Sequence, residues 1–372
     1  MSLCKKVLDF IERPDVSGFE ALALEVFRYQ FGKVAPYRDY CVSIGVSPEN
    51  VRSLDEVPAV STLAFKYAAL ENRELSALAG RRVFFTSGTT IGRDERGRHL
   101  VPRPEIYRAS ALAHLRRMLF PDAMRLRMLA LHPDAERMPE SSLAQMISWC
   151  IEEFGLEPSA IAASRHGIDA RLAMDFLGEA ERDKAPVCIF GTTASFSALF
   201  AGLDEHGKCF RLAAASRAMD TGGAKGQAVP MEPAELILGC ARRLGLEPAM
   251  VINEYGMTEL CSQLYDATPF NSGDSGKPAR RAKLGPPWLG CTAVDPITLR
   301  PVAQGEPGLL RFFDLANVGS VSCVLTEDFG RVEGGRVYLA GRAAMADARG
   351  CALGIEQFSS RERTRVADGE VR

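Results

Sequence analysis

Apolar and polar residues alternate along this chain with the periods that distinguish helices from strands. Apolar residues three or four apart indicate helices, and short runs of consecutive apolar residues indicate buried strands. The expected helices are Phe19–Phe31, 104–120, Pro139–Phe154, Ile168–Arg182, Ala194–Leu203 and Pro233–Leu244. The expected strands are Arg81–Thr86, Leu126–Leu131, Pro186–Phe190, Cys209–Ala215 and Ala249–Ile252. Strands alternating with helices predict an α/β fold with a largely parallel sheet.

The pattern changes from Lys283 onward, where short β-like runs are separated by Gly, Pro and Asp. We expect strands at Thr292–Val294, Gly308–Phe313, Ser322–Thr326 and Arg336–Leu339. Residues 1–340 are therefore predicted to form one domain, with a mostly helical part over 1–80 and a β-rich subdomain over about 283–340. Residues 341–372 are too few for a core of their own.

Composition and charge exclude several classes of protein. The net charge of −2 over 372 residues gives no basic excess, so nucleic acid is not the expected partner. No stretch is apolar enough to serve as a signal peptide or a membrane span. The ten cysteines include no Cys-x-x-Cys and the five histidines show no metal-binding spacing. We therefore expect a cytoplasmic protein with reduced thiols, most of them small core residues.

A loop rich in hydroxyls and glycine follows the first expected strand. It contains Thr86, Ser87, Gly88, Thr89 and Thr90. Hydroxyls and free backbone N–H groups at the end of a strand are suited to binding phosphates. The loop is not a Walker A motif, because no Gly-Lys-Ser/Thr closes it. A plain Ser/Gly turn is the alternative.

Two further loops follow expected strands. In the first, the paired Gly222 and Gly223 let a planar group such as adenine lie against the backbone, although a plain turn explains them equally well. The second contains Tyr255, Gly256, Thr258 and Glu259. This segment places a hydroxyl and a carboxylate at the mouth of a sheet, which suits a phosphate held by Thr258 and Mg²⁺ held by Glu259.

Three residues near the C-terminus complete the candidate chemistry. Asp328 at an expected strand end suits ribose hydroxyls, with an Asx turn as the alternative. Arg342 follows a strand and a glycine, as a phosphate-facing guanidinium on a hinge would. Cys351 lies between Gly350 and Ala352 and near arginines, a setting that favours a reactive thiolate. An inert, partly buried thiol is the alternative for Cys351.

The order of these segments resembles that of the adenylate-forming superfamily of acyl-CoA synthetases. Within it the chain most resembles the acyl-protein synthetase family, the fatty-acid-activating component of the bacterial bioluminescence fatty-acid reductase. The resemblance covers roughly residues 60–356. It is carried by Phe65-Lys66, the Ser-Gly-Thr-Thr loop, Thr221–Gly226, Glu254–Glu259, Pro287-Trp288, Asp314–Asn317 with Ser320, Thr326–Asp328 and Arg349–Leu353.

This resemblance implies the fold of an adenylate-forming N-terminal domain, with parallel sheets flanked by helices and residues 341–372 as the remnant of a truncated lid. It implies an ATP- and Mg²⁺-dependent ligase that converts a fatty acid to acyl-adenylate and then transfers the acyl group to a thiol. Cys351 matches the family's C-terminal acceptor cysteine in position and context. A reductase or another acceptor protein would then receive the acyl group. A thiolate is a good nucleophile for such a transfer.

Two departures from the superfamily pattern bear on the site residues. Ile91 stands where the phosphate loop has a second glycine, and Gly92 follows it. No lysine follows Lys283, whereas the longer synthetases close a lysine-bearing lid on the adenylate. The resemblance therefore implies that Arg342 or Lys225 supplies the missing cation.

Two other hypotheses remain open at this point. The acyl acceptor can instead be coenzyme A, a carrier protein or an amine, with Cys351 structural. Alternatively, the chain is a non-catalytic nucleotide-binding subunit, a hypothesis that Ile91 and the absent lysine favour. Phe190, Phe196 and Leu199 flank a glycine loop, but core packing is the better interpretation of all three. The chain length of the acid and the oligomeric state do not follow from the sequence.

Overall fold

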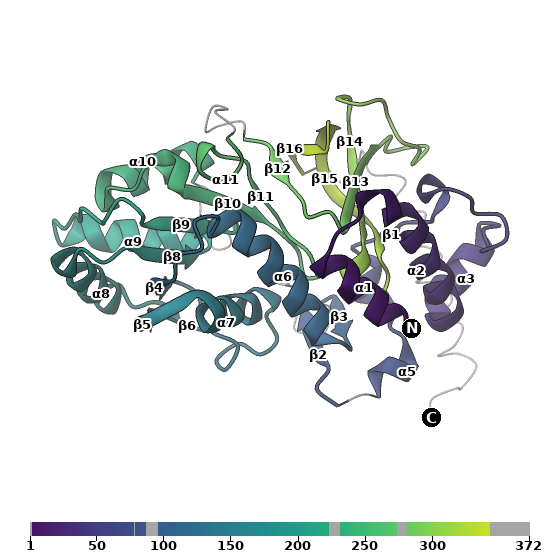
Figure 1. Cartoon of the computed structure of the whole chain (residues 1–372), viewed down its shortest axis with the longest axis horizontal. Helices are drawn as coiled ribbons and strands as arrows, with labels where there is room; N and C mark the ends of the chain where they lie inside the picture. The colour runs from purple at the N-terminus through teal and green to yellow at the C-terminus, as the bar shows by residue number, and fades with distance from the viewer. Residues whose placement is uncertain (1, 78, 87–95, 223–230, 274–280, 343–372) are drawn as a thin grey trace. The chain divides into compact units, whose positions relative to one another are not determined.

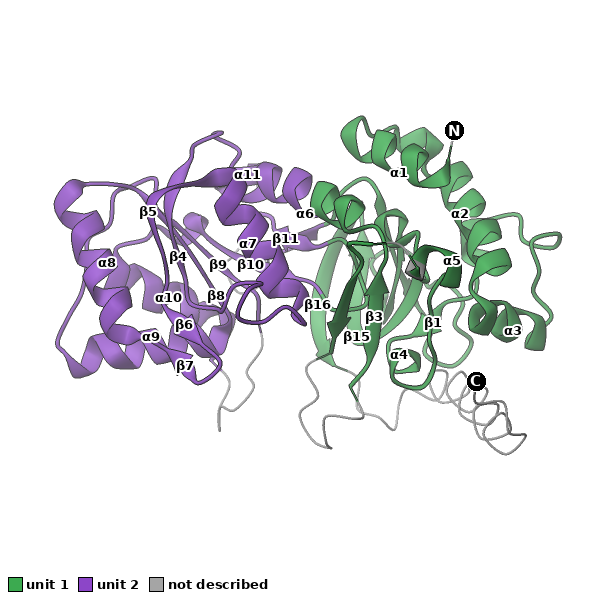
Figure 2. Cartoon of the chain, turned by 90° about the horizontal axis from the view of Figure 1, so that it is seen from below, with its two compact units in different colours: residues 1–110, 257–262, 285–372 green, residues 111–256, 263–284 purple. Residues whose placement is uncertain are grey.

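The structure is a computed structural model that describes residues 2–77, 79–86, 96–222, 231–273 and 281–342. Its helices and strands are labelled in Figure 1. They group into two compact units, which Figure 2 colours separately. Unit 1 comprises residues 1–110, 257–262 and 285–372, and unit 2 comprises residues 111–256 and 263–284.

Unit 2 is built on a sheet in the order β12-β11-β10-β9-β8-β4-β5. The strands are β4 (Leu126–Ala130), β5 (Gly155–Ile161), β8 (Val187–Gly191), β9 (Arg217–Asp220), β10 (Val251–Tyr255), β11 (Leu264–Asp266) and β12 (Lys283–Leu284). Neighbours from β5 to β10 are parallel, and β11 and β12 are antiparallel additions. Parallel strands end at the same edge, so the loops after β8, β9 and β10 share one edge of this sheet. The predicted parallel α/β arrangement is confirmed.

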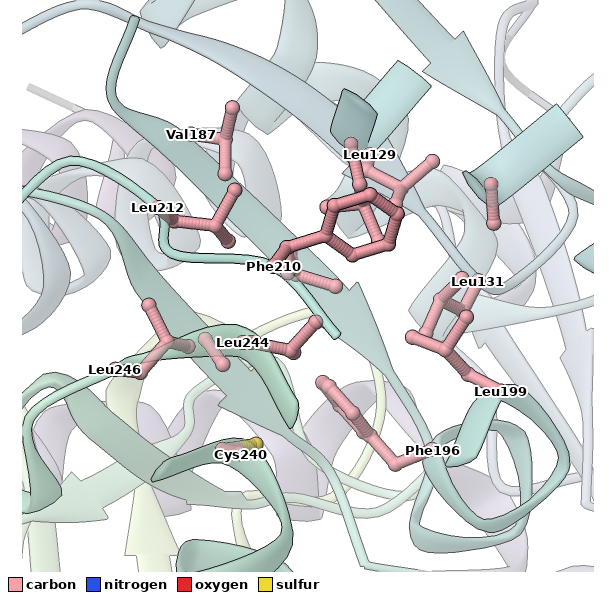
Figure 3. Close-up of a cluster of buried hydrophobic side chains, with 14 of the residues drawn as sticks. Leu129, Leu131, Val187, Phe196, Leu199, Phe210, Leu212, Cys240, Leu244 and Leu246 are labelled. Atoms are coloured by element: carbon pink, nitrogen blue, oxygen red, sulfur yellow. The ribbon is translucent and has the colours of Figure 1, made fainter. Parts of the chain in front are cut away.

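The longer helices of unit 2 each bury part of their surface. They are α7 (Ser142–Phe154), α8 (Ala170–Asp183), α9 (Thr193–Glu205), α10 (Pro233–Leu244) and the short α11 (Pro269–Ser272), with a 3₁₀ turn η4 (Pro248–Met250) and a small hairpin of β6 (Ala163–Ser164) and β7 (Gly167–Ile168). All five residues of β8 are buried, as expected for a central parallel strand. Figure 3 shows part of the core, in which Phe196 and Leu199 of α9 pack among leucines. Their prediction as core residues is confirmed.

One predicted strand of unit 2 is wrong. The stretch Cys209–Ala215 is irregular, and the strand begins instead at Arg217. Phe210 and Leu212 still pack in the core, which explains the apolar pattern without a strand (Figure 3). Arg217 is fully buried because its guanidinium pairs with Asp122 at 2.6 Å and donates to the carbonyl of Leu119 at 2.7 Å. Because this strand begins with a charged residue, Arg217, it does not form an apolar run and was not predicted.

Unit 1 contains an antiparallel sheet in the order β13-β14-β15-β16. These strands are β13 (Leu289–Val294), β14 (Pro307–Asp314), β15 (Cys323–Glu333) and β16 (Arg336–Arg342). The two-residue strand β1 (Val60–Ser61) pairs in parallel with Val324 and Leu325 of β15. A separate hairpin joins β2 (Arg82–Phe85) to β3 (Arg98–Val101). The predicted β-rich texture after Lys283 is therefore confirmed.

The first part of unit 1 is largely helical, as predicted for residues 1–80. Its helices are α1 (Leu3–Glu12), α2 (Phe19–Lys33), α3 (Ala35–Ser43), α4 (Ala64–Tyr67) and α5 (Arg73–Ser76), with 3₁₀ turns η1 (Val16–Gly18), η2 (Leu54–Glu56) and, after β14, η6 (Leu315–Asn317). Helix α6 (Pro104–Leu119) begins in unit 1 and ends in unit 2. None of the helices that the structure describes has both the length and the apolar character that crossing a bilayer requires.

Candidate active site

The segment from Tyr255 to Glu259 is divided between the two units. Tyr255 is the last residue of β10 and belongs, with Gly256, to unit 2. Thr258 and Glu259 belong to unit 1. Each unit therefore carries its own set of candidate residues.

In unit 1, Thr86 directly follows β2. Its backbone N–H donates to the carbonyl of Gly97 at 2.8 Å, and its hydroxyl accepts from the N–H of Gly97 at 2.8 Å. Arg96 donates to the carbonyl of Thr86 at 2.7 Å, which fixes the base of the loop. Ser87, Gly88, Thr89 and Thr90 lie outside the described residues.

The backbone of Thr258 and Glu259 is held by buried side chains from β3 and η6. A ring nitrogen of His99, Nδ1, lies 2.6 Å from the carbonyl oxygen of Thr258. Asn317 donates to the carbonyl of Glu259 at 2.9 Å. His99 and Asn317 are 1% and 2% exposed, so these bonds are shielded from water. Neither residue has a role in the sequence analysis, because the bonds of His99 to Thr258 and of Asn317 to Glu259 join positions 159 and 58 residues apart.

A second buried group, the carboxylate of Asp314, holds the end of the same segment. It accepts from the backbone N–H of Cys261 at 2.8 Å and from the hydroxyl of Ser262 at 2.7 Å. Ser262 and the indole N–H of Trp288 both lie within hydrogen-bonding distance of the Ser110 hydroxyl. Burial raises the pKa of Asp314 to about 6, against the lowering effect of its donors.

Glu259 is the buried carboxylate to which Mg²⁺ was assigned. It is 7% exposed, and burial raises its pKa to about 7, although the charges of Arg342 and Lys66 act in the opposite direction. The backbone N–H of Glu259 also lowers this pKa through a hydrogen bond to the carboxyl group, and the side chain forms no ion pair within the described part of the chain. A buried carboxylate without an ion pair is a fitting ligand for a divalent cation that also binds phosphates. No cluster of three potential metal ligands occurs among the described residues, so such an ion would rely on substrate oxygens.

Asp328 and Arg342 face each other across β15 and β16. They are register partners, and the Arg342 Nε atom lies 3.3 Å from Oδ1 of Asp328. The Arg342 side chain is 78% exposed, whereas that of Asp328 is 18% exposed. The expected placements are corrected in detail: β15 continues past Asp328 to Glu333, and Arg342 is the last residue of β16 rather than a residue beyond a strand.

On the other side of β15, toward β14, a register shift between Leu309 and Arg311 leaves Thr326–Asp328 without regular partners. Thr326 supports this irregularity, because its hydroxyl donates to the carbonyl of Leu310 and accepts from the N–H of Asp328. The Asp328 carboxylate therefore lies at a bulge. The sequence analysis, which relied on apolar runs, placed a strand end here because the apolar run stops at the bulge.

In unit 2, Gly222 occupies a turn at the shared end of β8 and β9. Its φ of +66° lies in the left-handed region that favours glycine. The carboxylate of Asp220 accepts from the N–H of Gly222 at 3.2 Å and from the hydroxyl of Thr193 at 2.9 Å. The carbonyl of Gly222 accepts from the N–H of Thr193 at 3.1 Å. The turn is thus fixed, and Gly223 and Lys225 lie beyond it, outside the described residues.

A buried chain of polar contacts continues from Asp220. Asn253 donates to Asp220 Oδ2 at 2.7 Å and accepts from Lys283, whose ammonium group also lies 2.7 Å from Asp266 Oδ1. Arg281 approaches the other oxygen of Asp266 at 3.5 Å. Negatively and positively charged side chains therefore alternate along the contacts that lead away from the turn at Gly222. The pairing of Lys283 with Asp266 depends on tertiary structure and left no sequence signal.

Gly256 is required by its surroundings. A Cβ atom at this position would overlap the carboxylate oxygen Oε1 of Glu254. Glu254 is 6% exposed, and burial raises its pKa to about 8, with Lys283 lowering it and Asp220 raising it. The backbone at residues 255 and 256 consequently passes close to a buried carboxyl group with no space for a side chain.

The fold of this chain is similar to that of solved structures of 2-hydroxyisobutyryl-CoA ligase. One structure has a TM-score of 0.61 at 18% identity and covers 89% of this chain and 68% of the ligase. Another, in an open conformation, has a TM-score of 0.59 at 17% identity and covers 87% and 74%.

The family is more specific. The family described as "Acyl-protein synthetase, LuxE" matches residues 9–359, and this chain belongs to it. The "long-chain-fatty-acid--luciferin-component ligase" of Aliivibrio fischeri is 23% identical over 366 residues, which cover 94% of this chain and 92% of the relative. The protein of the same name from Vibrio harveyi is 23% identical over 346 residues, covering 89% and 85%. The resemblance on which the sequence analysis relied is confirmed.

Proposed function

We propose that this chain activates a long-chain fatty acid with ATP and transfers the acyl group to the thiol of Cys351. The family match over residues 9–359 carries the proposal. The names of the relatives support a long-chain fatty acid as the substrate. The similar 2-hydroxyisobutyryl-CoA ligase was solved in complex with 2-HIB-AMP and CoA, which is consistent with an acyl-adenylate route on this fold.

In the first step a carboxylate oxygen of the fatty acid attacks the α-phosphorus of ATP. The bond from that phosphorus to the bridging oxygen of pyrophosphate breaks, and acyl-adenylate and pyrophosphate form. We assign the phosphates to Thr258 and to the loop residues Thr86, Ser87, Gly88, Thr89 and Thr90. Lys225 and Arg342 would stabilise the negative charge that develops on the phosphate oxygens.

We assign the two parts of the nucleoside separately. We assign the adenine to the backbone around Gly222, Gly223, Tyr255 and Gly256, where the fixed turn at Gly222 leaves a side-chain-free surface. We assign the ribose hydroxyls to Asp328. Its present partner, Arg342, is largely exposed, so that exchanging this ion pair for ribose hydrogen bonds would cost little.

The metal fits one residue of the described chain. Glu259 would hold Mg²⁺ through its buried carboxylate, and the bound ion would neutralise phosphate charge. The positive charges of Arg342 and Lys66, which act on Glu259 at a distance, favour the ionised carboxylate that this role needs.

In the second step the Cys351 thiolate attacks the carbonyl carbon of the acyl-adenylate. The bond from that carbon to the phosphate oxygen breaks, AMP leaves, and a thioester remains on the protein. The thiol must be reduced, so we place the reaction in a reducing compartment such as the cytoplasm. We propose that residues 341–372 act as the short lid that carries this cysteine, and that a reductase or another acceptor protein takes over the acyl group.

The test is the intact mass of the protein after incubation with Mg-ATP and fatty acids of several lengths, with and without hydroxylamine. We expect an acyl adduct that hydroxylamine removes and that the Cys351→Ser variant lacks. The matched control is Cys209→Ser, since Cys209 is an exposed cysteine of the same chain.

Pyrophosphate release distinguishes the alternatives. Fatty-acid-dependent release without an adduct would move the acceptor to coenzyme A, a carrier protein or an amine. Neither release nor adduct with any acid offered would contradict the proposal and favour a non-catalytic nucleotide-binding subunit.

A further inference from the structure

The segment Asp314–Asn317 is among the most specific features of the family resemblance, yet it has no role in the reaction described above. Together with His99 it attaches Met257–Ser262, the segment that carries Thr258 and Glu259. All of these residues belong to unit 1.

The orientation of the Asn317 amide determines which partners its nitrogen and its oxygen contact. Its nitrogen donates to the carbonyls of Glu259 and Val321, each at 2.9 Å. Its oxygen Oδ1 therefore faces His99 Nε2, at 2.8 Å, as an acceptor. His99 Nδ1 lies 2.6 Å from a second oxygen, the carbonyl of Thr258. Both oxygens are acceptors, so the imidazole donates to both only when it carries two N–H groups. Burial lowers the pKa of His99, whereas the two contacts raise it toward that form.

Two successive carbonyl groups are held in this way, that of Thr258 by His99 and that of Glu259 by Asn317. Each carbonyl defines the plane of its peptide group, because peptide bonds are planar. Fixing both planes fixes the φ and ψ angles of Glu259, and with them the direction of its Cα–Cβ bond. The carboxylate assigned to the metal therefore points where His99 and Asn317 direct it.

Simple packing does not account for polar residues at these positions. Burying an imidazole and an amide is unfavourable unless each finds partners, and apolar side chains would fill the same volume more favourably. A fully hydrogen-bonded buried network, by contrast, selects one arrangement of the backbone it contacts. Phe65 limits the orientation of the imidazole further, because the two rings lie edge to face with centroids 5.7 Å apart.

We propose that His99 and Asn317 are positioning residues that set the direction of Glu259 and Thr258 for Mg-ATP, an inference that rests on the proposed function. Asp314 secures the following residues, Cys261 and Ser262. The segment Asp314–Asn317 then acts as a clamp on the nucleotide-binding motif and has no direct contact with the reacting atoms.

The test is the His99→Gln variant, because a glutamine amide cannot reach both oxygens from the position of the ring. Its matched control is His114→Gln, since His114 is also a buried histidine, 2% exposed, that contacts a backbone carbonyl, that of Leu284, in unit 2. Two readouts are compared: amide hydrogen exchange over residues 257–262, and the KM for Mg-ATP in fatty-acid-dependent pyrophosphate release.

We expect His99→Gln to accelerate exchange at residues 257–262 and to lower kcat/KM for Mg-ATP by about 10- to 100-fold, mainly through KM, as observed when outer residues of metal sites are replaced. His114→Gln should change the thermal unfolding temperature while leaving both readouts unchanged. Asn317→Asp, which loses both N–H donors, should have a larger effect than His99→Gln and serves as the second variant if His99→Gln does not fold.

Unchanged exchange over residues 257–262 in both variants would overturn the clamp. Accelerated exchange with an unchanged KM would also overturn it, because the contacts would then be only structural. A wild-type protein without fatty-acid-dependent pyrophosphate release would contradict the proposed function. The clamp would then be supported or overturned by the exchange data alone.

Discussion

The two units support their parts of the candidate site with different chemistry. In unit 2 the turn at Gly222 rests on charges that alternate in sign, from Asp220 through Asn253 to Lys283 and Asp266. In unit 1 the segment with Glu259 is held by the amide of Asn317, the ring of His99 and the carboxylate of Asp314. The Glu259 carboxylate has no ion pair among the described residues.

This difference corresponds to the ligands proposed for each side. Adenine is neutral, so a turn that receives it needs a rigid backbone, and the charges beneath the turn can balance one another. A Mg²⁺ ion brings its own charge, so the carboxylate that receives it is best left without a cation of its own. The charge-balanced contacts of unit 2 are therefore consistent with the neutral adenine proposed there. The Glu259 carboxylate, which has no ion pair among the described residues, is consistent with the Mg²⁺ proposed for it.

Breaking the charge balance of unit 2 should have the largest effect. Lys283→Met leaves Asp266 with the longer contact to Arg281 as its remaining ion pair, beside the N–H of Asn253, and should lower the free energy of unfolding by about 3–5 kcal/mol, as for other broken buried pairs. Urea denaturation measures this. Lys5→Met is the control, since it removes an exposed pair with Asp9, and should have a far smaller effect. Equal effects of the two variants would show that the network of unit 2 contributes no more than a surface pair.

The second prediction concerns pH and Glu254, whose pKa is raised to about 8 from an ordinary value of 4.5. A carboxyl group with a raised pKa in the folded state binds its proton more tightly there, so stability is highest below about pH 4.5 and falls as pH rises through about 8. Glu254→Gln should remove this loss and stabilise the protein at pH 8.5 by up to about 4 kcal/mol.

The advantage of Glu254→Gln should disappear near pH 5, where Glu254 of the folded wild type is protonated. Denaturation at both pH values checks this, with the exposed Glu247→Gln as the control. A stabilisation that is the same at both pH values would contradict the assignment to a buried, titrating carboxyl group.

The third prediction tests the role of the Glu259 carboxylate in unit 1. Glu259→Gln keeps the shape of the side chain but removes the charge proposed to bind Mg²⁺. Loss of about 3 kcal/mol of transition-state stabilisation would reduce fatty-acid-dependent pyrophosphate release roughly a hundredfold. The apparent affinity for Mg²⁺ should fall as well. The control is Glu333→Gln, an exposed carboxylate at the end of β15. Unchanged Mg²⁺ dependence would place the metal on other groups.

The smallest effect is expected at Asp328. Asp328→Asn weakens hydrogen bonds to the ribose and releases Arg342, which should raise the KM for ATP about tenfold, equivalent to about 1.4 kcal/mol. Stability should change little, because the pair with Arg342 is largely exposed. Initial rates with ATP and with 2′-deoxy-ATP check the assignment. If Asp328 binds the 2′-hydroxyl, the variant should discriminate less between the two nucleotides than the wild type does.

Much of the fold was predictable because it depends on local patterns. Continuous burial marks β8, and apolar residues on one face mark α8 and α10. The strand β9 was missed because its first residue, Arg217, is a buried arginine whose partners are distant in sequence. The family was predictable because short motifs keep their order along the chain.

The candidate site was predictable only in part. The motif around Gly256 and the role of glycine at position 222 follow from short segments, and the close approach to Glu254 and the positive φ give physical reasons for both. The bonds of His99 to Thr258 and of Lys283 to Asp266 appear only once the chain is folded. All assignments of residues to ATP, Mg²⁺ or catalysis stay predictions, as does the boundary at residues 340 and 341. Seven of these residues also lie outside the described ranges: Ser87, Gly88, Thr89, Thr90, Gly223, Lys225 and Cys351.

The two-residue strand β1 has a consequence for the handling of this protein. Val60 and Ser61 pair with the stretch of β15 at Val324 and Leu325, while β16 pairs with the same strand from Asp328 onward. The N–H of Thr62 also donates to the carbonyl of Leu325. An N-terminal truncation beyond Thr62 would open a buried strand edge to other molecules, and such edges promote aggregation. Shortened versions that begin after this point should accumulate in inclusion bodies even where their nucleotide-binding motifs are intact.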